Sequence, residues 1–503
     1  MPGINWTQLV HPNYAFLLPE LVITVTMLFV MVTDFYVKEK RTLVWVTLAG
    51  VLLSLAGVWF SATDPGIKAA MDSGKPLEFF GNMVIADSFT FFLKAAVLGA
   101  IGLVILLSVD YVGQFLKGMF LEFYEVLLCA TLGMLLMVSS RDLITIYIGL
   151  ELTSISSYVL AGLLRKDAKS NEAALKYFLN GALASAIFLF GLSLIYGATG
   201  TTYLPEIAKA LGAYVSQGKA MLPLLVTGML FMAGGFSFKI AAVPMHLWAP
   251  DAYEGAPTPV TGFFSVGPKA AALGAILRIF LVGMSASQLS QKWMLVWAVL
   301  ATASMFVGNL TALSQKNIKR MMAYSSIAQA GYILVGVVAA GLTNTGSAAV
   351  LYYVLGYIFT NLGIFAVLTH MDQEGGWVTI SDFNGLAQRN PVYAWSLVLF
   401  FVSLIGIPPT VGFMGKFYLF NAAVGSHYTW LAILMAINSV ISVGYYYGVV
   451  KAMFLEKSEK ESLKSNGGVM TAVVVSFVGV LVLGIMAQPF LTYANTAANL
   501  LVK

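Results

Sequence analysis

Five ionisable residues stand inside stretches of the sequence that are otherwise apolar. They are Glu151, Lys176, Lys239, Lys269 and Lys416. A charged side chain at the centre of a bilayer costs at least ~3 kcal/mol on insertion scales, so a residue kept there is by default a candidate for function. Because carboxyl and amino groups give up and take protons, this set indicates proton or ion transfer.

Lys239 and Lys269 belong to one stretch, Gly234 to Ala272, in which helix-breaking residues accompany the charges. A Pro-rich loop with His246 separates the two lysines, and Gly267-Pro268 directly precedes Lys269. Broken helices at membrane depth leave backbone groups that only protein neighbours or internal water can satisfy. Ionisable groups beside such breaks are typical of ion-conducting transporters. His246 is either a proton relay, because imidazole titrates near pH ~6.5 in water, or a structural loop residue.

Glu151, in the run IYIGLELTSISSYVLAG, is interpreted as an ion partner for one of the lysines. Burial disfavours the charged forms of both groups, whereas their mutual attraction favours them. Separating such a pair therefore promotes release of the lysine's proton. The alternative is a carboxyl that stays protonated and bonds a hydroxyl.

The other lysines have different expected roles. Lys176 lies within about two turns of one end of its span, so its side chain either reaches the membrane surface or tunes the coupling of Glu151 with Lys239. Lys269 is expected to connect two half-channels, and the small residues around it permit close helix packing. Lys416 is expected to carry protons in the second half of the chain.

Composition restricts the class of protein that can position these residues. Of the 503 residues, 59% are hydrophobic and only 10% are charged, whereas a soluble domain carries about 25% charged residues. We therefore expect an all-α polytopic membrane protein. The single cysteine, Cys129, excludes a disulfide framework and a Cys-ligated metal or iron–sulfur site. The four histidines are dispersed, so we expect no metal site and no cofactor, and the net charge of +5 does not suggest nucleic acid.

Fourteen apolar windows of about 20 residues are long enough to cross the bilayer. The windows centred near Met229 and Ser403 are interrupted by Pro and Gly and are expected to be discontinuous helices. With the N-terminus outside, the inner loops hold fourteen Lys and Arg residues and the outer side holds seven. This asymmetry is the one expected of cytoplasmic loops, and it places both termini outside. Of the cations within spans, Lys94, Arg278 and Lys451 are expected to reach the membrane surface with their charged ends.

Short matches at a nearly constant offset indicate an internal repeat. Tyr158–Gly162 resembles Tyr332–Gly336 at an offset of 174, and Ala173–Tyr177 resembles Ala348–Tyr352 at 175. Lys239 and Lys416 are 177 residues apart. The offset covers five spans, and an odd number of spans reverses membrane orientation, so the copies must be inverted.

The expected organisation is a three-helix segment (1–120), two inverted five-helix repeats (121–284 and 292–455) and a final helix (456–503). The repeat mate of Lys269 falls near Tyr445 and Tyr446, whose hydroxyls could hold a chain of water molecules or simply pack. Asp251 and Glu254 are interpreted as solvated loop charges.

Five segments closely resemble the N-type antiporter-like subunit of respiratory complex I, the proton-translocating NADH:quinone oxidoreductase. They are GLELTSISSYVLAGLL, EAALKYFLNGALASAIFLFGLSLIYG, APTPVTGFFSVGPKAA, NIKRMMAYSSIAQAGYILVG and PPTVGFMGKFYLF. The resemblance implies fourteen helices with two inverted five-helix repeats, and it implies that Glu151, Lys176, Lys239, Lys269 and Lys416 are proton-path residues. The M-type sister usually has Glu at the position of Lys416, which favours the N-type. Gln329 departs from the family, which often has His after AYSSIA, but its amide can still bond water.

The resemblance implies a translocase subunit of the bacterial cytoplasmic (inner) membrane. Protons would enter from the cytoplasm, pass Lys239, Lys269 and Lys416, and leave outside. The chain itself is expected to hold no cofactor, since NADH, FMN, iron–sulfur clusters and quinone would be bound by other subunits. Its expected partners are neighbouring membrane-arm subunits, lipids, protons and water. Two alternatives are a subunit of a multisubunit cation/proton antiporter and a scaffold subunit that conducts nothing.

Overall fold

A computed structural model of the protein describes residues 14–116, 118–217, 222–376, 378–458, 467–499 and 501. Within this part of the chain, thirteen helices are long and apolar enough to cross a membrane, and the shorter apolar helix α17 (Pro391–Ile405) adds one more. The expectation of about fourteen spans is therefore confirmed. Five of the cations used to predict the orientation lie outside the described residues: Lys117, Lys219, Lys460, Lys464 and Lys503.

The elements follow one another with short connections. The first part of the chain forms η1 (Tyr14–Leu17), α2 (Leu18–Tyr36), α3 (Thr42–Thr63), α4 (Pro65–Asp72), β1 (Leu77–Phe79), β2 (Val84–Ala86), α5 (Ser88–Phe115), α6 (Phe120–Ser139), α7 (Leu143–Ala161), α8 (Ala168–Thr199), α9 (Leu204–Gln217), α10 (Leu222–Lys239), α11 (Trp248–Gly255), α12 (Thr258–Arg278) and η2 (Ile279–Gly283). The remainder forms α13 (Ser287–Ala312), α14 (Ile318–Ala340), α15 (Asn344–Gly375), η3 (Ile380–Phe383), α16 (Leu386–Arg389), α17, α18 (Val411–Gly425), α19 (Thr429–Leu455), α20 (Gly467–Ile485) and α21 (Ala487–Asn499). The two strands pair antiparallel as a hairpin.

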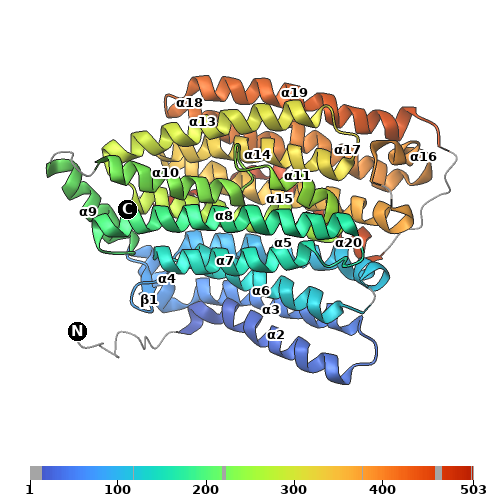
Figure 1. Ribbon diagram of the computed structural model, residues 1–503, viewed down its shortest axis with the longest axis horizontal. Coiled ribbons are helices and arrows are strands. Elements are labelled where there is room, and N and C mark those ends of the chain that lie inside the picture. The colour runs from blue at the N-terminus through green and yellow to red at the C-terminus, as the bar shows by residue number, and fades with distance from the viewer. Residues whose placement is uncertain are drawn as a thin grey trace.

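The long helices run side by side, with α2 and α3 at one edge and α18 and α19 at the opposite edge (Figure 1). Helices α14, α12, α15 and α5 form the centre, because 94%, 89%, 89% and 83% of their most apolar windows are buried by other parts of the chain. The corresponding share is only 33% in α2, α8 and α19. A helix that is apolar on all sides and only partly covered by protein is typical of a membrane span.

Two spans are broken, as expected. Helix α10 ends at Lys239, residues 240–247 are not helical, and α11 follows. Helix α17 ends at Ile405, residues 406–410 are not helical, and α18 follows. Each break contains a cis X-Pro bond, at Val243-Pro244 and Pro408-Pro409. The two lysines lie on opposite sides of their breaks, since Lys239 precedes one and Lys416 follows the other.

Each predicted repeat contains five spans in the same order. The first set is α6, α7, α8, α10 with α11, and α12, and the second is α13, α14, α15, α17 with α18, and α19. In both sets the fourth span is the broken one. The inverted repeat itself and its boundaries stay a prediction.

Candidate functional site

Lys239 occupies the last position of α10, directly before the first break. Its side chain is buried, and its Nζ donates a hydrogen bond of 3.0 Å to Ser154 Oγ on α7. Glu151 lies one turn before Ser154 on the same helix, and its carboxylate is the charge that acts on the Lys239 ammonium. Glu151 is half-buried and accepts a hydrogen bond from Ser185 of α8. The structure thus brings Glu151 and Lys239 within electrostatic reach, with a serine hydroxyl beside the lysine.

Lys269 lies in α12 just after Pro268, which is inside the helix. Its Nζ donates to Ser326 of α14 twice, at 2.5 Å to the hydroxyl and 3.1 Å to the carbonyl oxygen. The Ser326 hydroxyl also accepts a 2.9 Å hydrogen bond from Tyr357 and lies 3.2 Å from the Tyr253 hydroxyl. A cavity of about 10 Å³ adjoins the lysine, which is close to the smallest volume that holds a water molecule.

Lys416 lies in α18, after the second break. Its Nζ donates to the carbonyl oxygens of Leu404 at 2.8 Å and Ile405 at 3.0 Å, which are the last two residues of α17. A third bond of 2.7 Å goes to Ser439 Oγ on α19, and the Tyr332 ring centroid is 4.3 Å away. The last carbonyls of a helix have no intrahelical partner and carry partial negative charge. The lysine therefore satisfies carbonyls that the break leaves free.

Helix α14 joins the two lysine sites, because it carries Ser326 and, one turn later, Gln329. Gln329 Nε2 donates to the Leu404 carbonyl oxygen at 3.3 Å, which is the oxygen that Lys416 also bonds. The Tyr353 hydroxyl donates to Gln329 Oε1. Polar groups thus extend from Lys269 along α14 to Lys416, and Gln329 lies between them; its role as a relay stays a prediction.

The two tyrosines predicted as relays lie in α19 beside this line. The Tyr446 hydroxyl is 2.5 Å from Ser325 Oγ, and the Tyr445 hydroxyl donates to Asn309 Oδ1 at 3.0 Å. Asn309 in turn donates to the Tyr332 hydroxyl at 2.9 Å. Both tyrosines are buried, so their hydroxyls belong to a polar network that lies among α13, α14 and α19.

Lys176 does not lie between Glu151 and Lys239 but forms ion pairs with two other acidic residues. Its Nζ contacts Asp251 at 2.7 Å and Glu172 at 2.6 Å, and its side chain is 42% exposed. The expectation that it reaches the end of its span fits these contacts better than a position between the other two residues. Asp251 also accepts a 2.6 Å hydrogen bond from Arg320.

Asp251 and Glu254 were expected to be solvated loop charges, and this was wrong. Glu254 contacts Lys169 at 3.0 Å and Arg320 at 3.1 Å, and only about a quarter of either acidic side chain is exposed. These ion pairs lie around an open cavity of about 150 Å³ that we call the charged cavity, lined by Lys169, Glu172, Ala173, Asp251, Glu254, Gly255 and Arg320. The sequence placed the acids between two prolines and gave no sign that α8 and α14 would bring cations to them.

His246 lies half-buried in the loop between α10 and α11. Among the described residues, no hydrogen bond joins its imidazole to Lys239 or Lys269. Its role as a relay stays a prediction.

Two cations that were expected to reach the membrane surface are instead buried in ion pairs. Arg278 is 1% exposed and donates to both carboxylate oxygens of Asp87, at 2.9 and 3.1 Å. Lys94 is fully buried and contacts Glu20 at 2.6 Å. Hydropathy could not predict either pair. The one available signal was Glu20, an acidic residue inside the first apolar run, which pairs with Lys94. Lys451, by contrast, has a 54% exposed side chain near the end of α19, as expected.

Comparison with known proteins gives consistent relatives. The family model described as NADH:quinone oxidoreductase/Mrp antiporter, TM matches residues 140–442. A protein of Symbiobacterium thermophilum named NADH-quinone oxidoreductase subunit N 2 is 64% identical, and the alignment covers 100% of both chains. The NADH-quinone oxidoreductase subunit N of Trichlorobacter lovleyi is 42% identical over 99% of this chain and 100% of its own length.

Solved structures have the same fold. A chain of respiratory complex I from Thermus thermophilus with bound aureothin matches with a TM-score of 0.77 and 31% identity, covering 94% of this chain and 98% of that one. A chain of an archaeal membrane-bound sulfane sulfur reductase matches with a TM-score of 0.85 and 25% identity, covering 97% and 98%. A chain of the Mrp complex from Dietzia has a TM-score of 0.82 at 22% identity over 98% of each chain, which shows the fold alone.

Proposed function

The chain belongs to the family of NADH:quinone oxidoreductase and Mrp antiporter membrane subunits, as an N-type subunit, and from that membership we propose how it moves protons. It is an antiporter-like subunit of the membrane arm of complex I, and it works as part of a translocase. Glu151, Lys239, Lys269 and Lys416 carry the proton path. Quinone reduction elsewhere in the complex supplies the energy.

Two hydrogen bonds to the carbonyl oxygen of Leu404 are the observation that carries this proposal. Lys416 and Gln329 both donate to it, and Gln329 lies one turn from the serine that bonds Lys269. Three helices thereby support a polar connection between two buried lysines. A lysine ammonium only donates hydrogen bonds, whereas serine and tyrosine hydroxyls both donate and accept. Protons therefore pass between the lysines through hydroxyls and water, and Gln329 positions the water.

The Glu151–Lys239 pair acts as the switch at the first break. Attraction to Glu151 favours the charged lysine, while burial disfavours it. When the carboxylate is neutralised or moves away, Lys239 gives up a proton towards Lys269. The buried Ser154 hydroxyl accepts a 3.0 Å hydrogen bond from the Nζ and itself donates to the Leu150 carbonyl oxygen, so it positions the lysine, and water carries the released proton.

The charged cavity is where protons reach this path from the cytoplasm. Its volume of about 150 Å³ has room for several water molecules. Lys176 holds two of its lining residues, Asp251 and Glu172, so Lys176 influences proton uptake rather than the buried pair itself. The cytoplasmic position of the cavity and the outer position of both termini are parts of this proposal.

NADH, FMN, iron–sulfur clusters and quinone act in other subunits, and this chain contributes proton transfer. Its neighbours are other membrane-arm subunits and the lipids of a bacterial cytoplasmic membrane. Residues 121–284 and 292–455 act as two inverted half-channels, with the three-helix segment and the final helix beside them.

The test uses inverted membrane vesicles that contain the whole complex. NADH oxidation and vesicle acidification are followed together for the wild type, for Lys239→Met and for Lys451→Met as a matched control at an exposed lysine. We expect Lys239→Met to slow acidification by about 10²-fold or more, because positioned proton-transfer groups contribute about 10²–10⁴-fold. The control should match the wild type. Wild-type acidification in Lys239→Met, with normal assembly, would overturn the path.

The same vesicles and variants also separate the two alternatives, when an ion gradient is applied in the absence of NADH. A cation/proton antiporter subunit would acidify or alkalinise vesicles in response to a sodium or potassium gradient without NADH. A scaffold subunit would tolerate loss of Lys239 as long as the complex assembles.

A further inference from the structure

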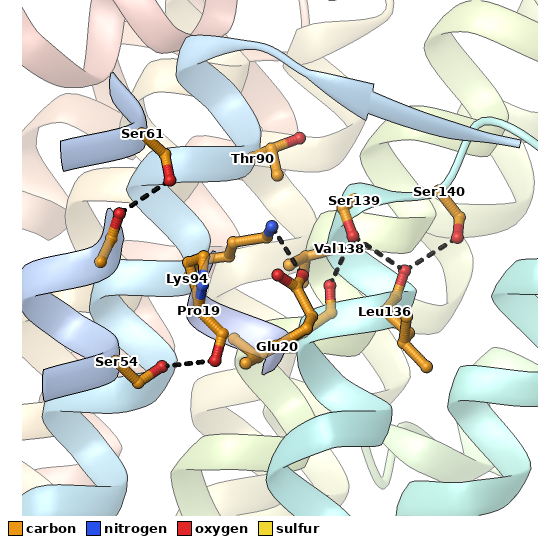
Figure 2. A network of polar contacts seen from close by, with 12 residues as sticks. Pro19, Glu20, Ser54, Ser61, Thr90, Lys94, Leu136, Val138, Ser139 and Ser140 are labelled. Carbon is orange, nitrogen blue, oxygen red and sulfur yellow. Dashed lines mark hydrogen bonds and ion pairs between the residues drawn. The ribbon is translucent and has the colours of Figure 1, made fainter. Parts of the chain in front are cut away.

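The N-terminal helices hold a second buried pair of opposite charges, apart from the path between Glu151 and Lys416. Glu20 lies in the first turn of α2, and Lys94 lies in the second turn of α5. Glu20 Oε1 is 2.6 Å from Lys94 Nζ, and the two side chains are 7% and 0% exposed. Figure 2 shows the two groups facing each other between α2, α5 and α6.

These two charged groups lack other hydrogen-bond partners among the described residues. An ammonium can donate three hydrogen bonds and a carboxylate can accept about four, so most of this capacity is unused. The hydroxyls nearby are occupied by backbone carbonyls (Figure 2): Ser54 donates to Pro19, Ser61 to Ala15, and Ser139 to Leu135. Besides the contact itself, the charged form has the Phe16 ring, whose centroid is 5.9 Å from Lys94 Nζ, and the N-terminal turn of α2 at Glu20, but no further hydrogen bond among the described residues.

The pair between Asp87 and Arg278 provides a contrast about two helical turns away. Arg278 donates two bonds to Asp87 and a third, of 2.9 Å, to Thr90 Oγ1, and the Thr90 amide donates to Asp87 at 2.7 Å. Arginine stays protonated in proteins, so this well-coordinated pair cannot exchange a proton. Lysine can release one, and Lys94 follows Thr90 by one turn on the same helix.

We propose that the Glu20–Lys94 pair is an additional proton-holding site of the subunit, and this inference rests on the proposed function. In the charged form the amine carries three protons and the carboxylate none. Transfer across the contact breaks one N–H bond and forms one O–H bond, which leaves a neutral amine and a carboxylic acid. The amine can then take a proton from water, and the acid can release one to water, so a proton passes through the pair and restores the charged form.

The pair can exist in a charged form, with an ammonium and a carboxylate, or in a neutral form, with an amine and a carboxylic acid. Burying two charges costs several kcal/mol per ion, and their attraction repays this only when further hydrogen bonds complete the coordination. Those bonds are missing here, which brings the neutral form within reach. Apolar residues of similar volume would pack at least as well, so packing does not explain why both groups are present.

Exchange with water requires only a short distance. Lys94 is seven residues from Asp87, which caps α5, and this corresponds to about 10 Å along a helix. Ser139 and Ser140, at the end of α6, lie on the same side, and Ser140 pairs with Val84 of the β-hairpin. Exchange at the membrane face where α5 begins requires water to enter past Asp87, Ser139 and Ser140, which are buried.

Lys94→Arg in the whole complex is the decisive variant, because it keeps the positive charge beside Glu20 but does not release its proton. Acidification and NADH oxidation are measured together in inverted vesicles, with Lys451→Arg as the matched control. We expect normal assembly and a loss of acidification per NADH oxidised that the control does not show. Wild-type acidification in Lys94→Arg overturns the proposal.

A second variant, Glu20→Met with Lys94→Met, removes both charges at similar volume and leaves no polar side chain unpaired at the site. A purely structural pair predicts wild-type acidification in this double variant, whereas a proton-holding pair predicts that the loss persists. Failure of both variants to assemble assigns the pair to stability and also overturns the proposal. Lys239→Met is measured alongside: if it lowers acidification while Lys94→Arg does not, only this inference fails, and if neither does, the proposed function fails as well.

Discussion

Lys416 bonds the carbonyl oxygen of Leu404 across the second break, at 2.8 Å. The two residues belong to different helices, α18 and α17, so this bond joins the halves of a broken span. The same lysine is thus both a helix cap and a candidate proton carrier. These two roles can be separated by substitution.

Lys416→Arg should keep the cap and abolish the proton transfer. Arginine donates to the free carbonyls of α17 as lysine does, but it does not deprotonate in proteins. We expect the complex to assemble and NADH-driven acidification to be lost. Lys416→Met should in addition lower the free energy of unfolding by about 1–3 kcal/mol, because the Ile405 carbonyl would lose the lysine and the Leu404 carbonyl would keep only its bond from Gln329. Equal activity of Lys416→Arg and wild type would remove Lys416 from the path.

Gly412→Ala should disturb the approach of α17 to α18. A Cβ at this position would overlap the carbonyl oxygen of Ser403, which is backbone and cannot move away alone. We therefore expect Lys416 to lose its bond to Leu404 and acidification to fall, with a lower melting temperature of the complex. Gly425→Ala is the matched control in the same helix, since its Cβ would meet no atom within 4 Å.

Gln329 should tolerate histidine but not leucine. Gln329→Leu leaves the Tyr353 hydroxyl without its acceptor and removes one donor from the Leu404 carbonyl. Histidine can donate, accept and itself carry a proton near neutral pH. We expect slower acidification in Gln329→Leu and a rate at or above wild type in Gln329→His, measured with the same NADH-driven assay. A wild-type rate in Gln329→Leu would contradict the positioning role.

Arg278→Met should strongly destabilise the subunit without a specific effect on proton transfer. It leaves the Asp87 carboxylate buried and unpaired, which costs about 3–5 kcal/mol. The expected readout is loss of the subunit from the complex on heating, compared with Lys451→Met. Proton translocation per NADH oxidised should be normal in whatever complex remains. A specific loss of coupling in assembled complex would show that this pair, too, takes part in transfer.

The ion pairs around the charged cavity should respond to acid. Burial acts to raise the pKa of Asp251, but hydrogen bonds from Lys176 and Arg320 outweigh burial and hold this pKa below its ordinary value. The carboxylate therefore contributes stability above the ordinary pKa of about 3.9, and this contribution disappears as the pH falls through the lowered value. We expect Lys176→Met to move acid inactivation of the complex to higher pH. An unchanged acid profile would exclude a role of Lys176 in holding Asp251.

Local sequence patterns were sufficient to predict the spans, their breaks and the lysines that stand within them. Hydropathy is a property of consecutive residues, and a length of about 20 apolar residues is set by the bilayer, so local reading is sufficient for these features. The Pro-rich loop after Lys239 and the Pro and Gly residues near Ser403 likewise predicted the two discontinuous helices.

Which buried charge meets which partner depends on the packing between helices that are distant in the sequence. Arg278 and Asp87 are separated by 191 residues, and no local pattern distinguishes a lysine that reaches the membrane surface from one that is paired inside, as Lys94 is with Glu20. Asp251 was misjudged for the same reason, because its cations come from α8 and α14. A charge is stable in the bilayer only where another helix supplies its counter-charge or hydrogen bonds, and that supply depends on packing between helices.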